Sequence, residues 1–227
     1  MSEGLWCLMT AGRPTWRDVV ESCQTAGMTQ RGLLMFDGHD PGPVDLPDNW
    51  SMVVGEQRRG IGPMMAQVYA DYPDAAFYGW LADDTYPRTS GWDVELSEAA
   101  GPWKLSYADD GGYIARSDLV QGTNLSSGLC WGGDLVRTVG WWALPGLEAA
   151  WVDWIWVQLI APLGLGAYTP TVTVEHLHFS VGGREVDEHD LRSRSTTEPT
   201  RHIFDAWYRD ERAATIRRIC RALPDDV

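Results

Sequence analysis

Short apolar runs alternate with helix-like segments through the first half of the chain, and this alternation limits the fold more than any other feature. Apolar runs of strand length occur at residues 5–9, 32–36, 51–54 and 77–81. Pro14 and Pro63 stand where helices over residues 14–26 and 63–72 would begin. This order predicts an α/β protein with a mostly parallel sheet flanked by helices.

The second half of the chain has a less regular pattern. We expect strands over residues 103–107 and 171–179, a short apolar piece at 128–133, and helices over 135–139, 147–163 and 199–223. Residues 184–227 contain nine Arg against ten Asp and Glu, whereas residues 1–183 are strongly acidic. We therefore divide the chain into a domain of residues 1–183 and an Arg-rich helical extension of residues 184–227 that packs on it.

Composition excludes several classes of protein. The 227 residues are 44% hydrophobic, which suffices for a full core, and no apolar run is long enough to span a membrane. The net charge of −14 argues against tight, nonspecific binding to nucleic acid, although the Arg-rich extension permits a local contact. The four scattered cysteines and the lack of a signal-like start predict a cytoplasmic protein with reduced thiols.

The run Phe77–Leu81 ends in two adjacent carboxylates, Asp83 and Asp84. Open α/β sheets bind their ligands at the carboxyl ends of strands, so this pair lies where a ligand is expected. Two negative charges near a core are costly unless a cation neutralises them, and a hard divalent metal such as Mg²⁺ or Mn²⁺ fits oxygen ligands and also binds phosphate. A solvated Asp-Asp-Thr turn is the structural alternative.

Other polar residues follow the same predicted sheet edge. Asp37 comes just after a strand, where it either accepts hydrogen bonds from a ribose or a base, or forms an Asx-turn. Arg13, Arg58 and Arg59 are the nearest basic residues, and guanidinium groups suit a diphosphate. Simple solvation is the alternative for each arginine.

Two further patterns are candidates for chemistry. His176 and His178 lie two apart on a predicted strand and so share one face, which permits a metal ligand beside Asp84 or, alternatively, one buried and one surface histidine. Asp153 lies within a Trp-rich helix start, where burial would make it a general base; a solvent-facing helix charge is the alternative. Some of the 13 tryptophans could stack on a sugar or a base, with candidates Trp80, Trp131, Trp141 and Trp142.

The order of these parts resembles that of small, family-2-like nucleotide-sugar glycosyltransferases of the GT-A fold from bacteria and their phages. The resemblance covers residues 5–180. Its pieces are Thr10 and Arg13 after the first strand, Asp37, Arg58-Arg59-Gly60, Ala82-Asp83-Asp84, Cys130-Trp131-Gly132-Gly133, Val152-Asp153 and the His-x-His strand. The chain departs from the family pattern at Ala82 and Val152, where many relatives have acids.

The resemblance implies a role for each of these positions. Asp84 would bind the metal (Mn²⁺ or Mg²⁺) with His176 or His178, and Asp153 would deprotonate the acceptor. The implied contacts with the nucleotide sugar are Thr10, Arg13, Asp37, Arg58, Arg59, Asp83, Trp131, Gly132 and Gly133.

These roles imply transfer of a sugar, with inversion, from a nucleoside diphosphate sugar, expected to be a UDP-sugar, to a hydroxyl group. The acceptor is left open among a glycan, a small molecule and hydroxymethylated pyrimidines in phage DNA, and the oligomeric state is also open. The expected location is the cytoplasm of a bacterium or a phage-infected host. The alternatives are a nucleotidyltransferase, which would normally have a Lys-containing, Gly-rich loop after the first strand, and a non-catalytic carbohydrate-binding protein.

Overall fold

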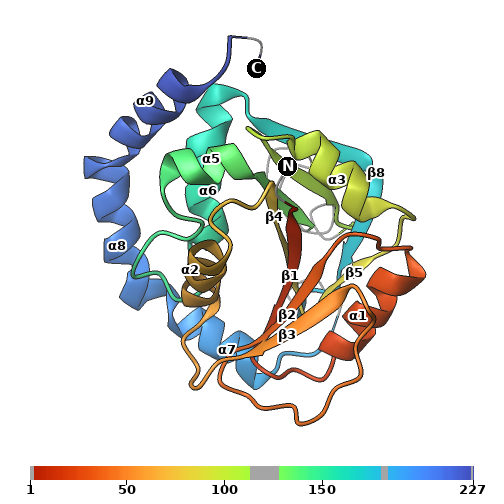
Figure 1. The fold of residues 1–227 in the computed structure, drawn as a ribbon. Coiled ribbons are helices and arrows are strands. Elements are labelled where there is room, and N and C mark those ends of the chain that lie inside the picture. Colours follow the sequence, from red (N-terminus) through yellow and green to blue (C-terminus); the bar gives the residue numbers. More distant parts are fainter. Residues whose placement is uncertain (1–2, 113–127, 180–183, 226) are drawn as a thin grey trace.

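A computed structural model describes residues 3–112, 128–179, 184–225 and 227, and its elements alternate between strand and helix as the sequence predicts (Figure 1). The strands are β1 (Leu5–Thr10), β2 (Gly32–Phe36), β3 (Trp50–Val54), β4 (Phe77–Ala82), β5 (Thr85–Pro87), β6 (Leu105–Asp109), β7 (Leu129–Gly132) and β8 (Gly166–His176). The helices are α1 (Trp16–Thr25), α2 (Ile61–Asp71), α3 (Trp92–Ala100), α5 (Gly133–Val139), α6 (Val152–Ile160), α7 (Glu188–Ser195), α8 (Thr197–Asp210) and α9 (Arg212–Ala222), with a 3-10 turn at Ala161–Leu163.

The described strands form one sheet in the order β3-β2-β1-β4-β7-β6-β8-β5. Strands β3, β2, β1 and β4 run parallel, and so do β6 and β8. Strand β7 runs antiparallel to both β4 and β6, and β5 runs antiparallel to β8. The predicted mostly parallel sheet is thereby confirmed, and β7 inside the sheet and β5 at its end run in the reverse direction.

The connection between β4 and β5 forces the sheet to curl. Only Asp83 and Asp84 join these strands, yet β4 lies in the middle of the strand order and β5 lies at its end. The far end of the sheet must therefore bend round until β8, with β5 on its edge, reaches the carboxyl end of β4. The curl sets the acid pair at a corner of the sheet, beside the end of β8.

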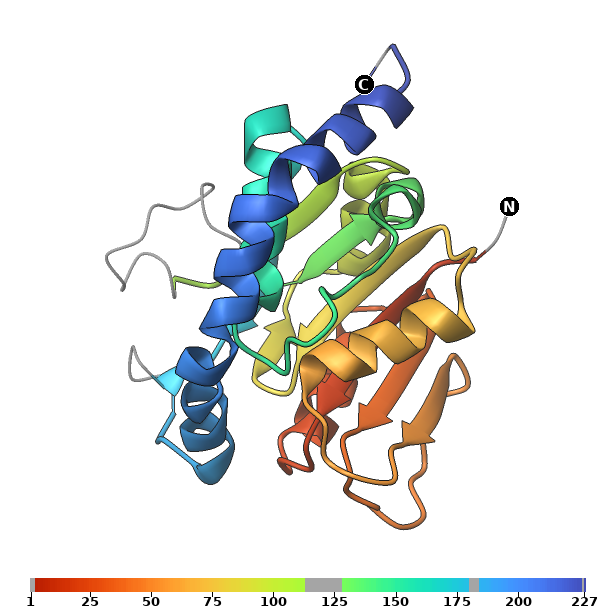
Figure 2. The same cartoon turned by 90° about the vertical axis from the view of Figure 1, so that its left-hand side faces the viewer.

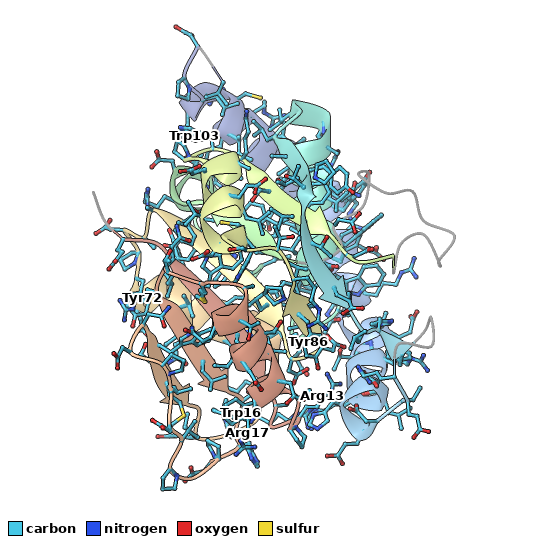
Figure 3. The ribbon with its side chains drawn as sticks, turned by 90° about the vertical axis from the view of Figure 1, so that its right-hand side faces the viewer. Arg13, Trp16, Arg17, Tyr72, Tyr86 and Trp103 are labelled. Atoms are coloured by element: carbon cyan, nitrogen blue, oxygen red, sulfur yellow. The ribbon has the colours of Figure 1, made fainter. Side chains whose placement is uncertain are left out.

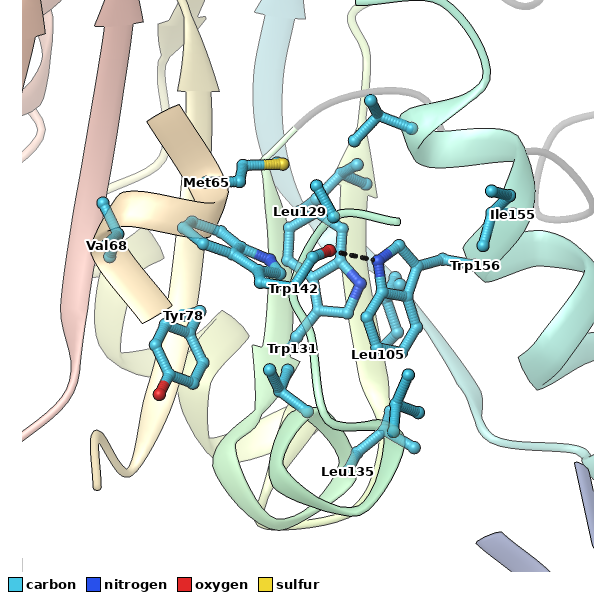
Figure 4. Packing of buried hydrophobic residues seen from close by; sticks show 14 of the residues in the cluster. Met65, Val68, Tyr78, Leu105, Leu129, Trp131, Leu135, Trp142, Ile155 and Trp156 are labelled. Carbon is cyan, nitrogen blue, oxygen red and sulfur yellow. Dashed lines mark hydrogen bonds between the residues drawn. The ribbon is translucent and has the colours of Figure 1, made fainter. Parts of the chain in front are cut away.

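Helices cover both faces of the sheet, and each face has its own core. Helices α1 and α3 pack on one face with Trp6, Trp16 and Trp92. Helices α2, α5 and α6 cover the other face, where Trp131, Trp142 and Trp156 pack against one another (Figure 4). The Trp156 indole N–H donates to the carbonyl oxygen of Trp142 at 2.9 Å, which satisfies a polar group that the core would otherwise leave unpaired.

The extension adds a further helical layer on the second face (Figure 2). Helix α9 packs on α5 and α6, and Trp207 of α8 and Ile219 of α9 belong to the same core cluster as the domain. Part of the extension therefore completes the core of the preceding domain. The boundary at residue 183 stays a prediction.

Several predicted elements differ from the observed ones. The helix predicted over residues 147–163 begins only at Val152, and the strand predicted over 171–179 is instead Gly166–His176. The single tail helix is broken at Glu211 into α8 and α9, although no Gly or Pro marks that point. Strand β5 and helix α3 were not predicted. Among the described residues, no helix is long and apolar enough to cross a membrane.

Candidate active site

The parallel strands bring their terminal polar residues to one edge of the sheet. Thr10 ends β1, Asp37 follows β2, and the acid pair follows β4; the register aligns Thr10 with Phe36 and Met9 with Ala82. A cleft of about 520 Å³ opens at this edge. Its lining includes the predicted site residues Thr10, Arg13, Asp37, Arg58, Asp83, Asp84, Asp153, His176 and His178.

Asp83 is buried at the base of the cleft and held by β1 and the segment after it. Its carboxylate accepts a hydrogen bond from the Thr10 hydroxyl at 2.7 Å and an ion-paired one from Arg13. Burial raises the pKa of Asp83 to about 6, with Arg13 and the Thr10 hydrogen bond opposing the rise. Thr10 and Arg13 therefore fix the position of the Asp83 carboxylate.

Asp84 is surrounded by cationic and imidazole groups. Its Oδ2 lies 2.9 Å from Arg184 Nη2 and 3.7 Å from Arg13 Nη1, and its Oδ1 lies 3.4 Å from His176 Nε2. Burial opposes ionisation, but these three partners outweigh it and hold the pKa of Asp84 below its usual value. Asp84 is thus a carboxylate that stays ionised at the corner of the curled sheet.

The two histidines come from the end of β8 and the residues after it. His176 pairs with Thr85 in the β5–β8 register, and its ring centroid lies 5.0 Å from that of His178. Burial and the neighbouring His176 lower the pKa of His178 to about 4. Both rings line the cleft, and His176 Nε2 lies 3.4 Å from Asp84 Oδ1.

A divalent metal at this corner would take part of its coordination from outside the protein. Among the described residues, no group of three or more His, Cys, Asp or Glu side chains is placed to hold a metal ion. Asp84 and His176 do supply a carboxylate and an imidazole at adjoining positions. Because Mg²⁺ usually takes one or two carboxylates together with substrate phosphates, this pair suffices for a metal carried in on a diphosphate.

Asp37 has a structural task in the cleft. Its two carboxylate oxygens accept the backbone N–H groups of Arg59 and Gly60, each at 2.7 Å, and so fix the turn before α2. This turn carries Arg58 to the cleft, where its guanidinium meets the ring of His189 at 3.2 Å. Arg59 instead reaches Gln67 along α2 at 2.8 Å and does not line the cleft.

Asp153 lies in the first turn of α6, on the wall of the cleft. Its Oδ1 accepts the backbone N–H of Trp154 at 2.8 Å. The surrounding protein atoms raise the pKa of Asp153 through desolvation, with that hydrogen bond opposing the rise. The residue is nevertheless exposed to the solvent of the cleft, which limits the effect. Asp153 is therefore accessible from the cleft.

The start of α6 depends on an unusual backbone conformation. Trp151 has φ +73°, a left-handed value that a bulky side chain rarely adopts. Two contacts from α8 stabilise this conformation. The Trp151 ring stacks on Phe204 with centroids 5.1 Å apart, and the Trp151 indole N–H donates to the carbonyl oxygen of Thr197 at 3.0 Å. The extension thus fixes the point from which Asp153 enters the cleft.

Trp131, Gly132 and Gly133 do not lie in the cleft, so their predicted contacts with a nucleotide sugar are not supported. The register pairs Gly132 with Phe77, the first residue of β4, whereas the acid pair follows its last residue. A strand rises ~3.3 Å per residue, so these ends are at opposite edges of the sheet. Trp131 is fully buried, as is Trp142, and neither can form a stacking platform.

The sequence reading missed the residues that the extension contributes. Arg184, Asp187, His189 and Asp190 all contact the predicted site: Arg184 meets Asp84, Asp187 and Asp190 meet Arg13, and His189 meets Arg58. In Figure 3 Arg13 lies between α1 and α7. The available signal was the dense run of charged residues at 184–190, one Arg followed by four acids, shortly after the His-x-His segment.

Comparison with known proteins places the fold. No protein-family model and no curated protein sequence matches this chain. A structure of GalNAc-T7 with UDP, GalNAc and Mn²⁺ matches with a TM-score of 0.55 and 10% identity, over 78% of this chain and 44% of that one. S. aureus TarS matches with a TM-score of 0.55 and 10% identity, over 100% of this chain and 50% of that one. Residues 1–349 of TarS match with a TM-score of 0.52 and 9% identity, over 100% of this chain and 82% of that one.

These neighbours are GT-A glycosyltransferases, and the chain has the GT-A fold. The expectation drawn from the order of the motifs is confirmed at the level of the fold. The chain spans about half the length of the first two structures that it matches.

Proposed function

We propose that this protein is a metal-dependent glycosyltransferase that moves a sugar from a nucleoside diphosphate sugar to an acceptor hydroxyl. One observation carries the proposal: a GT-A sheet edge opens into a cleft that brings together Asp83, Asp84, His176 and Asp153. The first three suit a divalent metal that carries a diphosphate, and the last suits removal of the acceptor proton. A UDP-sugar is the proposed donor, since a structural neighbour was solved with UDP and Mn²⁺.

The reaction forms one bond and breaks one bond at the same sugar carbon. The acceptor oxygen bonds to the anomeric carbon as the bond from that carbon to the diphosphate oxygen breaks, and the electron pair leaves with the diphosphate. Asp153 takes the acceptor proton as attack begins, because its carboxylate lines the cleft and is exposed to it. A single base opposite the leaving group predicts inversion at the anomeric carbon.

The chain's own residues prepare the donor end of the cleft. Asp84 and His176 would hold the metal, which when bound supplies Lewis-acid stabilisation of the leaving diphosphate. Arg13, buried beside the acid pair, adds fixed positive charge near the same place. Asp37 holds the turn that presents Arg58, so the nucleoside is proposed to lie between that turn and β1.

The net charge of the chain bears on which acceptor we propose. A glycan or a small molecule suits an acidic protein better than DNA does, because a net charge of −14 repels phosphates. Incubation with a labelled sugar nucleotide and, separately, a glycan mixture or hydroxymethylated DNA distinguishes these acceptors. Transfer of the label to DNA would identify the hydroxymethylated pyrimidine as the acceptor instead.

Donor binding can be tested without knowing the acceptor. A panel of sugar nucleotides with and without Mn²⁺ should contain one that stabilises the protein by about 2.7 kcal/mol at 100 times its dissociation constant. Thermal unfolding measures this shift, and NMR of the product anomer tests inversion. Failure of every nucleotide sugar to stabilise the protein, with or without Mn²⁺, would contradict the proposal.

A nucleotidyltransferase remains the second candidate. It shares paired acids on an α/β sheet, but the segment after β1 is Ala11-Gly12-Arg13-Pro14 and has no lysine. Release of pyrophosphate from a nucleoside triphosphate would favour this reading. Helices on both faces of the sheet count against an all-β carbohydrate-binding module.

A further inference from the structure

Arg184 places a guanidinium group against the carboxylate that is proposed to bind the metal. Its Nη2 lies 2.9 Å from Asp84 Oδ2, and its side chain is largely buried. The same guanidinium contacts Asp190 through both terminal nitrogens, at 2.5 Å and 2.6 Å. Arg184 thus contacts Asp84 through one guanidinium nitrogen and Asp190 through two.

The charges around Arg184 do not balance. Among the described residues, the ion-paired cluster joins the carboxylates of Asp83, Asp84, Asp187 and Asp190 to the guanidiniums of Arg13 and Arg184. Carboxylates outnumber guanidiniums by two, which is the charge of one divalent cation. The cluster can accept such a cation without expelling either arginine, provided that Asp84 is released.

We propose that Arg184 and the divalent metal compete for Asp84, and that the donor's diphosphate decides between them by drawing Arg184 to its own oxygens. The inference rests on the proposed function and adds a donor-site residue from the extension. Asp190 keeps the guanidinium at the cleft in both arrangements. A planar guanidinium binds phosphate oxygens in the same bidentate way as it binds carboxylate.

This exchange couples the two ligands thermodynamically. Metal binding releases Arg184 for the diphosphate, and diphosphate binding releases Asp84 for the metal, so each ligand tightens the other by the same factor. Mn²⁺ and UDP also associate in free solution, and the free energy of that association is subtracted from the measured coupling. The remaining coupling should disappear when residue 184 cannot pair with either anion.

The test is a set of Mn²⁺ and UDP titrations on the full chain and its Arg184→Gln variant. Free Mn²⁺ is followed by electron paramagnetic resonance, and UDP binding by calorimetry. Without UDP, R184Q should bind Mn²⁺ about tenfold more tightly than wild type, within the usual range for coupled sites. It should bind UDP alone more weakly, and UDP should no longer tighten Mn²⁺ binding beyond the association in free solution.

Two further variants separate position from charge. Arg209→Gln removes an exposed arginine of the extension that pairs with Asp210, so it should behave as wild type. Arg184→Lys keeps the charge and serves as the test variant where R184Q does not fold. A lysine cannot make the two hydrogen bonds that Arg184 makes with Asp190, so R184K should also bind Mn²⁺ more tightly than wild type. Equal Mn²⁺ affinity and equal coupling in wild type and the Arg184 variant would overturn the inference alone. A wild-type protein that binds neither Mn²⁺ nor UDP would overturn the proposed function with it.

Discussion

Asp83 and Asp84 are adjacent in sequence, yet their carboxyl groups differ in acidity because they face different partners. Asp83 points to Thr10 and Arg13 deep in the sheet edge, where burial dominates. Asp84 faces Arg184 and His176, which hold it ionised. The chemistry of each acid follows from its surroundings, since the residue type is the same.

The raised pKa of Asp83 predicts a pH-dependent stability. The folded state binds the Asp83 proton more tightly than the unfolded state, because the pKa rises from 3.8 to about 6. This contribution therefore becomes less favourable as pH increases through that interval. Between about pH 5 and about pH 7, wild type should lose about 1 kcal/mol of stability relative to Asp83→Asn. Urea denaturation at both pH values measures this, and a constant difference between the two proteins would contradict it.

Asp153 carries a second prediction at this scale. Asp153→Asn removes the proposed base while keeping the side-chain shape, so kcat should fall by about 10²–10⁴-fold with donor affinity unchanged. Glu148, another carboxylate lining the cleft, is the rival base. Steady-state kinetics and donor titration on D153N and E148Q decide between them. A large loss of kcat in E148Q alone would move the base to Glu148.

At the scale of elements, the corner between β4 and β5 creates the site. Parallel strands β1, β2 and β4 deliver their ends to one edge, and the curl of the sheet brings the end of β8 to the same place. Strand β7 runs in the reverse direction, so its carboxyl end lies away from the site. It carries Gly132 to the far edge, into close contact with the backbone of Pro102.

Gly132 is therefore predicted to serve packing. A Cβ at this position would lie 2.3 Å from the Pro102 carbonyl carbon, and neither backbone can easily move. Gly132→Ala should cost about 1–3 kcal/mol of stability. The matched variant Gly166→Ala, whose Cβ would meet its nearest atom at 3.6 Å, should change stability by no more than about 0.5 kcal/mol. Chemical denaturation checks both; a stable G132A that had lost UDP binding would restore Gly132 to the donor site.

At the scale of the whole molecule, the extension serves both the core and the cleft. Helix α9 packs on α5 and α6, while α7 and the residues before it contact Asp84 and Arg13. Helix α8 lies between and stabilises Trp151 at the start of α6. The cleft is thus built by the domain and the extension together.

Neighbouring aromatic residues on α8 test this integration. Trp207 is 2% exposed and Tyr208 is 46% exposed. Trp207→Ala should cost about 3–5 kcal/mol in one cooperative transition, whereas Tyr208→Ala should cost less than about 1 kcal/mol. Urea unfolding followed by circular dichroism measures both. A W207A protein that unfolds in two steps, with the domain unaffected, would indicate an independent extension.

The sequence by itself determined the alternating elements and the acids at the strand ends, because hydrophobic periodicity is a local property and strands joined through helices run parallel. It also located Asp37, Asp153 and the histidines in the cleft, since each lies at or near the end of an element. Only the tertiary structure decided that Arg184 meets Asp84, 100 positions away in the chain, and that Trp131 lies in the core. Such contacts depend on how the sheet curls and where the extension packs, and no local pattern encodes either.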